Sequence, residues 1–226
     1  MLRKGNETMN YTAIVLAAGS GSRTGLTYNK MFFALPDGRS VLEHSLDLFE
    51  QDPDCRQIVI VCAPAELEEV NDWSRKLKAA DKIICTTGGA TRQESVNNGL
   101  ARTEEEVVFI HDGARPFLRK EELEKLKKAM ETEKAALLCL PSVDTVKVVD
   151  ENGYVQETLP RNRLFQAQTP QAFRTDLIKE AHRKAALSGF EATDDAQIME
   201  VYGQVPVLCV IGDASNKKIT HPADLK

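Results

Sequence analysis

The chain has 226 residues, of which 42% are hydrophobic and 28% are charged, and its net charge is −5. The length suffices for one large core, and the composition is usual for a globular protein. The acidic balance argues against a nonspecific nucleic-acid binder, since such proteins are usually basic, but it allows a local basic site for phosphates. No apolar run reaches the roughly 18 residues that span a bilayer. We expect no nucleic-acid or membrane partner.

Short apolar runs alternate with helical patterns along the chain. The first five expected strands are Tyr11–Leu16, Gln57–Cys62, Lys82–Thr86, Val107–Ile110 and Ala135–Leu140. The helices expected between them are 41–49, 67–77, Thr91–Leu100 and Glu121–Met130. This alternation is typical of an α/β fold, here a three-layer Rossmann-like architecture with a mostly parallel sheet and helices on both faces.

The pattern changes after Pro141. Two alternating runs, 144–149 and 154–158, flank Asn152-Gly153, a strong hairpin signal. The hairpin is too polar for the main sheet, so residues 142–163 are expected to project as a β-arm, a candidate dimerisation element on a single domain, 1–226. Two helices, Arg174–Ser188 and Asp194–Tyr202, and a strand, Val207–Ile211, are expected after it, with Thr193 as the cap of the second helix.

The five cysteines include no Cys-x-x-Cys pair, and four of them lie in or beside apolar strand-like runs. Buried free thiols are the simplest interpretation. Reduced thiols, together with a polar N-terminal stretch that lacks a signal region, predict a cytoplasmic protein.

The chain is organised around the stretch Ala13–Arg23. An apolar run ends there in a loop of small residues, where Gly19 and Gly21 allow the backbone to approach a ligand closely. Successive N–H groups of such a loop form a concavity for anions. The arginine that closes the stretch and Lys30 add positive charge. A strand, a glycine loop and two cations together predict a polyphosphate site.

Two further loops carry similar residues. Gly88–Ser95 follows the third expected strand, and His111–Pro116 follows the fourth. Because ligands of open α/β sheets bind beyond the carboxyl ends of the strands, the loops after Leu16, Thr86 and Ile110 should meet at one edge. Glycine, arginine and small hydroxyls from three loops predict a nucleotide pocket.

The second of these loops has its own local signals. Gly88 and Gly89 leave backbone groups available to contact a base. Thr91 is expected to cap the following helix, with Glu94 three residues later completing a capping box.

With these residues in view, the chain closely resembles the 2-C-methyl-D-erythritol 4-phosphate cytidylyltransferases of the non-mevalonate isoprenoid pathway, whose fold is that of nucleotide-diphospho-sugar transferases. The resemblance runs in order from about Tyr11 to Leu225. The motifs that carry it are 16–23 with Lys30, 88–96, 111–116, 144–147, 161–171, 193–195 and 216–220.

The resemblance implies transfer of CMP from CTP to the phosphate of a sugar alcohol, with Mg²⁺ and release of pyrophosphate. The catalytic residues that it implies are Arg23, Lys30, Arg161 and Lys218. The nucleotide-binding residues would be Ala17, Ala18, Gly19, Gly21, Gly89, Ala90, Ser95 and Gly113. The substrate-binding residues would be Asp112, Arg115, Thr145 and Thr193, with Asp112 also the candidate metal ligand. A homodimer with exchanged arms is implied as well, so Thr145 and Arg161 would serve the partner's pocket.

Some positions depart from the family pattern. Thr24 and Asn29 stand where a methionine and a proline are usual, and Ala90 replaces a residue that is often polar. The nearest alternative is a ribitol-5-phosphate cytidylyltransferase, and a more distant one is a nucleotide-binding protein without activity. A nicotinamide dehydrogenase is disfavoured, because Thr24 occupies the third glycine position of the dinucleotide fingerprint.

Overall fold

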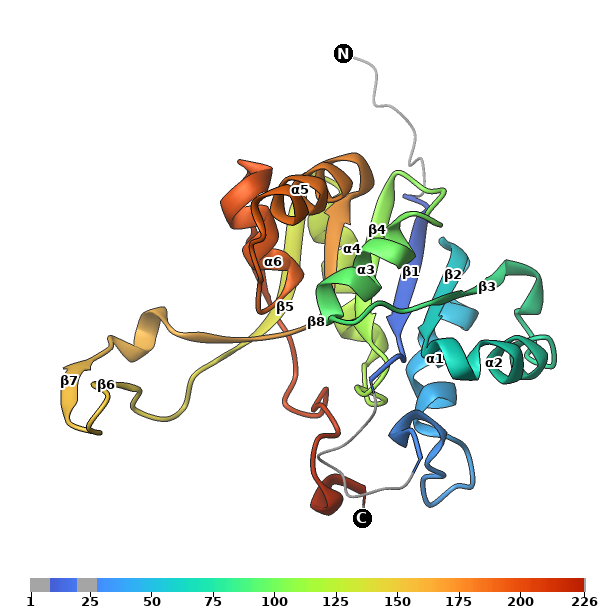
Figure 1. The fold of residues 1–226 in the computed structure, drawn as a ribbon, viewed down its shortest axis with the longest axis horizontal. Helices are drawn as coiled ribbons and strands as arrows, with labels where there is room; N and C mark the ends of the chain where they lie inside the picture. Colours follow the sequence, from blue (N-terminus) through green and yellow to red (C-terminus); the bar gives the residue numbers. More distant parts are fainter. Residues whose placement is uncertain (1–8, 20–27, 226) are drawn as a thin grey trace.

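The computed structural model of the chain describes residues 9–19 and 28–225. A seven-stranded sheet forms its centre (Figure 1), in the order β3-β2-β1-β4-β8-β5-β9. Its strands are β1 Tyr11–Leu16, β2 Cys55–Cys62, β3 Ile83–Thr87, β4 Val107–Asp112, β5 Ala135–Pro141, β8 Phe165–Arg174 and β9 Leu208–Ile211. Only β8 is antiparallel to its neighbours, β4 and β5. The predicted mostly parallel sheet is confirmed.

Helices cover both faces of this sheet. They are α1 Val41–Gln51, α2 Leu67–Ser74, α3 Arg92–Leu100, α4 Lys120–Met130, α5 Thr175–Ser188 and α6 Asp195–Ile198, which continues as a π-helix over Met199–Gly203. In β1, Ala13 and Val15 pack on one face with α1 and α4, whereas Ile14 packs on the other with α3 and α5. Side chains alternate between the faces of a strand, so β1 contributes to both cores. The predicted three layers are confirmed.

The strand β8 was not predicted. Its polar residues and Pro170 obscure it, since proline is rare inside a central strand. The register between β5 and β8 shifts where Leu137 pairs with Gln171 and Cys139 with Ala167. Pro170 lies within this irregularity, where no regular ladder bond from its nitrogen is needed.

Several element ends differ from the predictions. The strand β4 continues to Asp112, so the third loop of the site begins two residues later than expected. The helix α2 ends at Ser74 instead of residue 77. Thr193 is not the cap of α6: Asp194 is, with its Oδ1 accepting from the Gln197 N–H at 2.9 Å.

The expected hairpin forms a separate two-stranded sheet, β6 Lys147–Val149 with β7 Val155–Thr158. Gly153 in its turn has a φ of +84°, which agrees with the predicted Asn-Gly signal. The hairpin lies at the end of two long connections, away from the main sheet (Figure 1). A β-arm therefore projects from the body as expected.

All five cysteines are unbridged. Cys55, Cys62 and Cys139 are buried as predicted, Cys85 is half-buried, and Cys209 is exposed on the edge strand β9, contrary to the expectation of burial. Within the described ranges, no helix is both long and apolar enough to span a membrane.

Candidate active site

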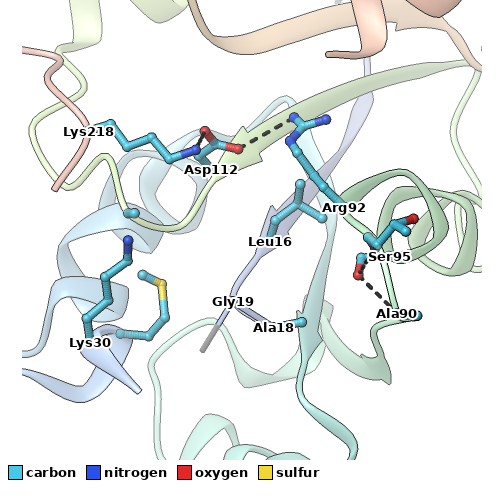
Figure 2. Close-up of a pocket in the computed structure, with 13 residues that line it drawn as sticks. Leu16, Ala18, Gly19, Lys30, Ala90, Arg92, Ser95, Asp112 and Lys218 are labelled. Atoms are coloured by element: carbon cyan, nitrogen blue, oxygen red, sulfur yellow. Dashed lines mark hydrogen bonds and ion pairs between the residues drawn. The ribbon is translucent and has the colours of Figure 1, made fainter. Parts of the chain in front are cut away.

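A cavity of about 540 Å³ opens where β1, β3 and β4 end (Figure 2). Its lining consists of Leu16, Ala18, Gly19, Lys30, Met31, Gly89, Ala90, Thr91, Arg92, Ser95, Asp112, Ala114 and Lys218. The three loops predicted to meet at one edge of the sheet therefore do meet, and eight of the predicted site residues line the cavity. The five lining residues that were not predicted as site residues are Leu16, Met31, Thr91, Arg92 and Ala114.

Lys30 begins a short 3-10 helix, Lys30–Phe32, which follows the glycine loop. Its side chain is largely buried, and Nζ donates to the carbonyl oxygen of Ile219 at 2.8 Å. This bond joins the first loop to the C-terminal segment that carries Lys218. Two predicted cations from opposite ends of the chain are thus brought to one cavity.

Asp112 is the acidic centre of the cavity. Lys218 Nζ donates to its Oδ2 at 2.7 Å, and Arg92 Nη2 lies 3.5 Å from its Oδ1. Burial alone would raise the pKa of the Asp112 carboxyl, but Arg92 and Lys218 outweigh burial and hold that pKa well below its usual range. Asp112 is therefore ionised throughout the physiological range.

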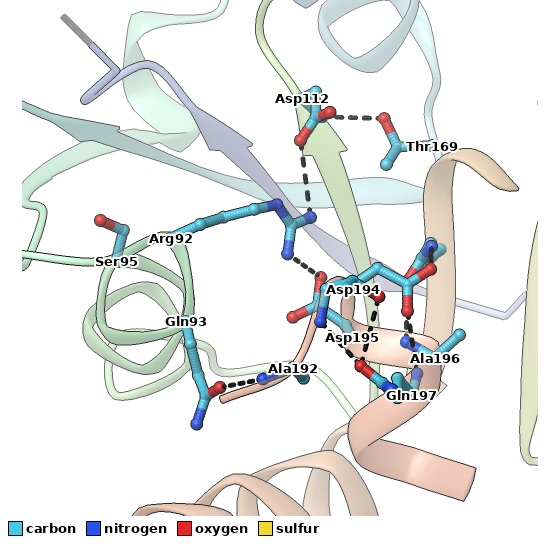
Figure 3. A network of polar contacts seen from close by, with 12 residues as sticks. Arg92, Gln93, Ser95, Asp112, Thr169, Ala192, Asp194, Asp195, Ala196 and Gln197 are labelled. Carbon is cyan, nitrogen blue, oxygen red and sulfur yellow. Dashed lines mark hydrogen bonds and ion pairs between the residues drawn. The ribbon is translucent and has the colours of Figure 1, made fainter. Parts of the chain in front are cut away.

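Arg92 is fixed in turn by a fully buried carboxylate (Figure 3). Its Nη1 donates to Asp195 Oδ2 at 2.9 Å, and the other oxygen of Asp195 lies 3.3 Å from His182 Nε2. Burial opposes the charge of Arg92, but Asp195 and Asp112 raise the pKa of the guanidinium. A chain of charges thus runs from the cavity into the core between α3 and α5.

Arg92 was not among the predicted site residues, although it lies inside the motif 88–96. Its position in the sequence nevertheless indicates a role at the site. It is the first residue of α3, directly after a loop predicted to bind the nucleotide. Its partner Asp195 lies 103 residues away, so local sequence patterns do not reveal the pair.

The N–H groups of the second loop are bonded within the loop and to β2. The N–H of Gly89 donates to Ser95 Oγ at 3.1 Å, and the N–H of Gly88 donates to Cys62 O at 2.8 Å. The prediction that these backbone groups are available to a base is therefore wrong for their N–H groups. Gly88 is required for space, since a Cβ there would lie 2.6 Å from the Cβ of Ala18.

The cap of α3 was predicted in part. Thr91 Oγ1 accepts from the Glu94 N–H at 3.1 Å, as expected. The Glu94 carboxylate bonds the N–H of Ala90 at 2.7 Å and not that of Thr91. The reciprocal half of the capping box is therefore displaced by one residue, from Thr91 to Ala90.

Three other predicted residues support the site from beneath and do not line it. Ala17 donates its N–H to Val61 O at 2.7 Å. A Cβ at Gly113 would lie 2.9 Å from Leu16 O, so this glycine allows close packing of the loop on β1. Arg115 Nη1 donates to Asn216 O at 2.7 Å and fixes the segment that carries Lys218.

Thr193, Thr145 and Arg161 lie outside the cavity lining. Thr193 bonds Gln197 ahead of α6. Thr145 and Arg161 are exposed in the arm, which projects away from the main sheet of the same chain (Figure 1). Gly21 and Arg23, the remaining predicted site residues, fall outside the described residues.

The chain was compared with known proteins. Residues 11–226 match the model of the family described as IspD, 2-C-methyl-D-erythritol 4-phosphate cytidylyltransferase. A protein of that name from Geobacillus kaustophilus is 43% identical over 219 residues, which cover 96% of this chain and 94% of the relative. A second, from Halalkalibacterium halodurans, is 42% identical over 218 residues, with the same coverage of both chains.

Solved structures agree with this match. The 4-diphosphocytidyl-2C-methyl-D-erythritol synthase from Anaerococcus prevotii superposes with a TM-score of 0.86 at 34% identity, covering 97% of this chain and 94% of that one. The 2-C-methyl-D-erythritol 4-phosphate cytidylyltransferase from Francisella tularensis gives 0.79 at 30% identity, covering 96% of each chain. The cavity contains the cations and the carboxylate described above. From the family match and these relatives, this chain belongs to the family of 2-C-methyl-D-erythritol 4-phosphate cytidylyltransferases and is a nucleotidyltransferase.

Proposed function

We propose that this protein uses the cavity to transfer CMP from CTP to 2-C-methyl-D-erythritol 4-phosphate, with release of pyrophosphate. The observation that carries this assignment to the cavity is the convergence of Lys30, Arg92 and Lys218 beside the glycine loop. Two polyanionic reactants repel each other, so the site must neutralise charge as well as orient the reacting atoms. Positioning and electrostatic stabilisation dominate phosphoryl-type transfers.

In the reaction, an oxygen of the acceptor phosphate forms a bond to the α-phosphorus of CTP. The bond from that phosphorus to the oxygen of the leaving pyrophosphate breaks. The second pKa of a phosphate monoester is about 6, so most of the acceptor is dianionic near neutral pH and needs no general base. His111 and His182 are accordingly assigned structural roles: they bond Arg115 O and Asp195 within the fold.

The cations have separate tasks in this proposal. Lys30, with Arg23 from the sequence motif, neutralises the CTP phosphates and the charge that develops on pyrophosphate. Lys218 lies beside Asp112 and serves the transferring phosphorus. Arg92 keeps Asp112 ionised and in place through its own anchor on Asp195.

The residues fit a magnesium ion. Asp112 is the single carboxylate among the described residues that line the cavity. Magnesium is commonly held by one or two carboxylates together with substrate phosphates. Asp112 would hold the ion in the loaded enzyme, and the ion would supply further charge neutralisation on the phosphates.

A homodimer with exchanged arms is part of the proposal. Arg161 and Thr145 lie on the arm, and neither lines the cavity of its own chain. The arm also exposes large apolar side chains, with Val143 at 76% and Tyr154 at 74% of their full exposure. A two-stranded hairpin is marginal alone in water, so a second subunit that covers it would stabilise it. In the dimer, Arg161 would orient the acceptor phosphate in the partner's cavity.

The experiment measures pyrophosphate release with CTP, Mg²⁺ and one of two acceptors. We expect rapid release with 2-C-methyl-D-erythritol 4-phosphate and slow release with ribitol 5-phosphate. Rapid release with ribitol 5-phosphate alone would contradict the acceptor assignment. Sedimentation of the intact chain and of a chain lacking 142–163 tests the dimer. We also place the reaction in the cytoplasm, which the five unbridged cysteines support.

A further inference from the structure

Asn29 precedes Lys30 and is 7% exposed. All of the hydrogen-bonding groups of its carboxamide are engaged. Its Nδ2 donates to Ala17 O and to Glu66 Oε2, each at 2.9 Å, and its Oδ1 accepts from the Met31 N–H at 3.1 Å. Because a backbone N–H can only donate and a carbonyl oxygen can only accept, the orientation of the amide is fixed by its partners.

These three bonds join three separate parts of the site. Ala17 follows β1 at the start of the glycine loop, and Met31 belongs to the 3-10 helix that begins with Lys30. Glu66 lies in another 3-10 helix, Pro64–Glu66, after β2. Asn29 is therefore the point at which the turn that carries Lys30 is tied to the glycine loop and to the 3-10 helix that follows β2.

The bond to Glu66 differs in kind from the other two. Its acceptor is a half-buried carboxylate, and hydrogen bonds to ionised groups are about twice as strong as neutral ones. It also has a reversible direction, since an amide at position 66 could donate to a carboxylate at position 29. Because the direction can be reversed, the bond to Glu66 can be tested separately from the bond that Asn29 Oδ1 accepts from the Met31 N–H.

We propose that Asn29 is a positioning residue for Lys30. It holds the lysine turn against the glycine loop through Ala17 and Glu66, so that the ammonium group lies ready for the phosphates of CTP. The inference rests on the role proposed above for Lys30. Asn29 does not line the cavity and touches no substrate in this scheme. A proline at this position, which the family pattern favours, would need another means of fixing the turn, since its side chain has no carboxamide.

The test uses Asn29→Asp in the full chain. The carboxylate keeps an acceptor for the Met31 N–H but has no donor for Ala17 O or Glu66. We expect kcat to fall by at least about tenfold, because displacing a catalytic group by about 1 Å can cost up to a hundredfold. The KM for the acceptor should change by less than about twofold, since the acceptor is bound elsewhere.

The rescue variant is Asn29→Asp combined with Glu66→Gln. The glutamine amide can donate to the new carboxylate, so the bond between positions 29 and 66 is restored with its direction reversed. We expect the double variant to recover at least about threefold of the lost kcat, whereas Glu66→Gln alone costs less than Asn29→Asp because its carbonyl still accepts. A role in stability alone would lower the melting temperature without this recovery of kcat. The matched control is Asn10→Asp, which makes the same chemical change directly before β1 and outside the cavity lining. It should leave kcat unchanged.

Two outcomes overturn the inference. If Asn29→Asp is folded and its kcat stays within about twofold of the wild type, the tie does not position Lys30. If kcat falls and the double variant recovers none of it, the bond to Glu66 does not position Lys30, and that part of the inference is overturned. Lys30→Ala separates the two proposals: normal turnover there overturns the role of Lys30 and this inference together, whereas slow turnover there with normal Asn29→Asp overturns this inference alone. Should Asn29→Asp fail to fold, Asn29→Ala, which introduces no charge, is measured by the same criteria.

Discussion

Replacing Asp195 with asparagine removes the buried charge that anchors Arg92. The carboxylate is completely buried, 2.9 Å from Arg92 Nη1 and 3.3 Å from His182 Nε2. Asparagine has nearly the same shape and can place its oxygen toward Arg92, so no cavity forms. The substitution isolates the charge, which is the reason to prefer it to alanine.

The expected loss follows from this geometry. Removing one partner of a buried ion pair costs about 3–5 kcal/mol. The side chain of Arg92 is 32% exposed and keeps Asp112 as a second partner, so we discount this to about 2 kcal/mol. For a chain of this size the melting temperature should then fall by about 4–8 °C. Turnover should fall as well, since an unanchored Arg92 is drawn closer to Asp112.

The pH dependence has a definite sign. Burial raises the pKa of Asp195, but Arg92 and His182 outweigh it and the pKa is lowered. The stabilisation is therefore fully present above the unfolded pKa of about 3.9 and is lost only as the pH falls through the lower, folded value. The difference in melting temperature between wild type and Asp195→Asn should stay constant between about pH 6 and pH 8.

Thermal unfolding followed by circular dichroism measures this effect. Asp72→Asn is the matched control, because it removes an exposed ion pair with Arg75 and should shift the melting temperature by about 1 °C or less. A shift as small as this for Asp195→Asn would refute the argument that the buried pair stabilises the fold. A difference that disappears between about pH 6 and pH 8 would assign the effect to a group other than the carboxylate.

Three further outcomes test the site. Lys30→Ala should lower kcat by about a hundredfold or more, the scale for losing one transition-state donor, and near-normal kcat would contradict its role. Arg161→Ala should raise the KM for the sugar-alcohol phosphate while the KM for CTP is retained, and the opposite pattern would show that Arg161 serves the nucleotide. Gly88→Ala should lower the melting temperature by about 2–12 °C, since overpacking costs about 1–3 kcal/mol, and an unchanged value would show that Ala18 and Ser95 can yield to the new methyl group.

The sheet was largely predictable because its strands carry their own signal. Tyr11–Leu16 was predicted with the bounds that β1 has, since an apolar run that ends in a glycine loop leaves little choice of boundary. By contrast, β8 combines glutamines with a proline, and its identity as a strand depends on β4 and β5 on either side. Long-range pairing decides that strand, and single-sequence patterns report only local preference.

The site shows the same division. Lys30, Asp112 and Lys218 were predicted because each lies in a motif, and the cavity joins them. The bonds that fix them were not predictable: Asp195 holds Arg92 from a distant helix, and Asn29 bonds Glu66 across 37 positions. Asn29 departs from the family pattern, and nothing in the sequence shows that its carboxamide has three partners in the structure.

The arrangement around Asp112 explains how a cavity can hold several cations before the substrates bind. Lys218 and Arg92 would repel each other without a shared anion, and Asp112 lies 2.7 and 3.5 Å from their respective nitrogens. Folding thus places the positive charges and offsets part of their desolvation, so less reorganisation remains for the reaction. In the proposed reaction, phosphate oxygens that enter the cavity would meet cations already in position, and Asp112 would then be available for the proposed magnesium ion. Asp112 thus organises the two cations of the cavity, and under the proposed function it would also hold the magnesium ion.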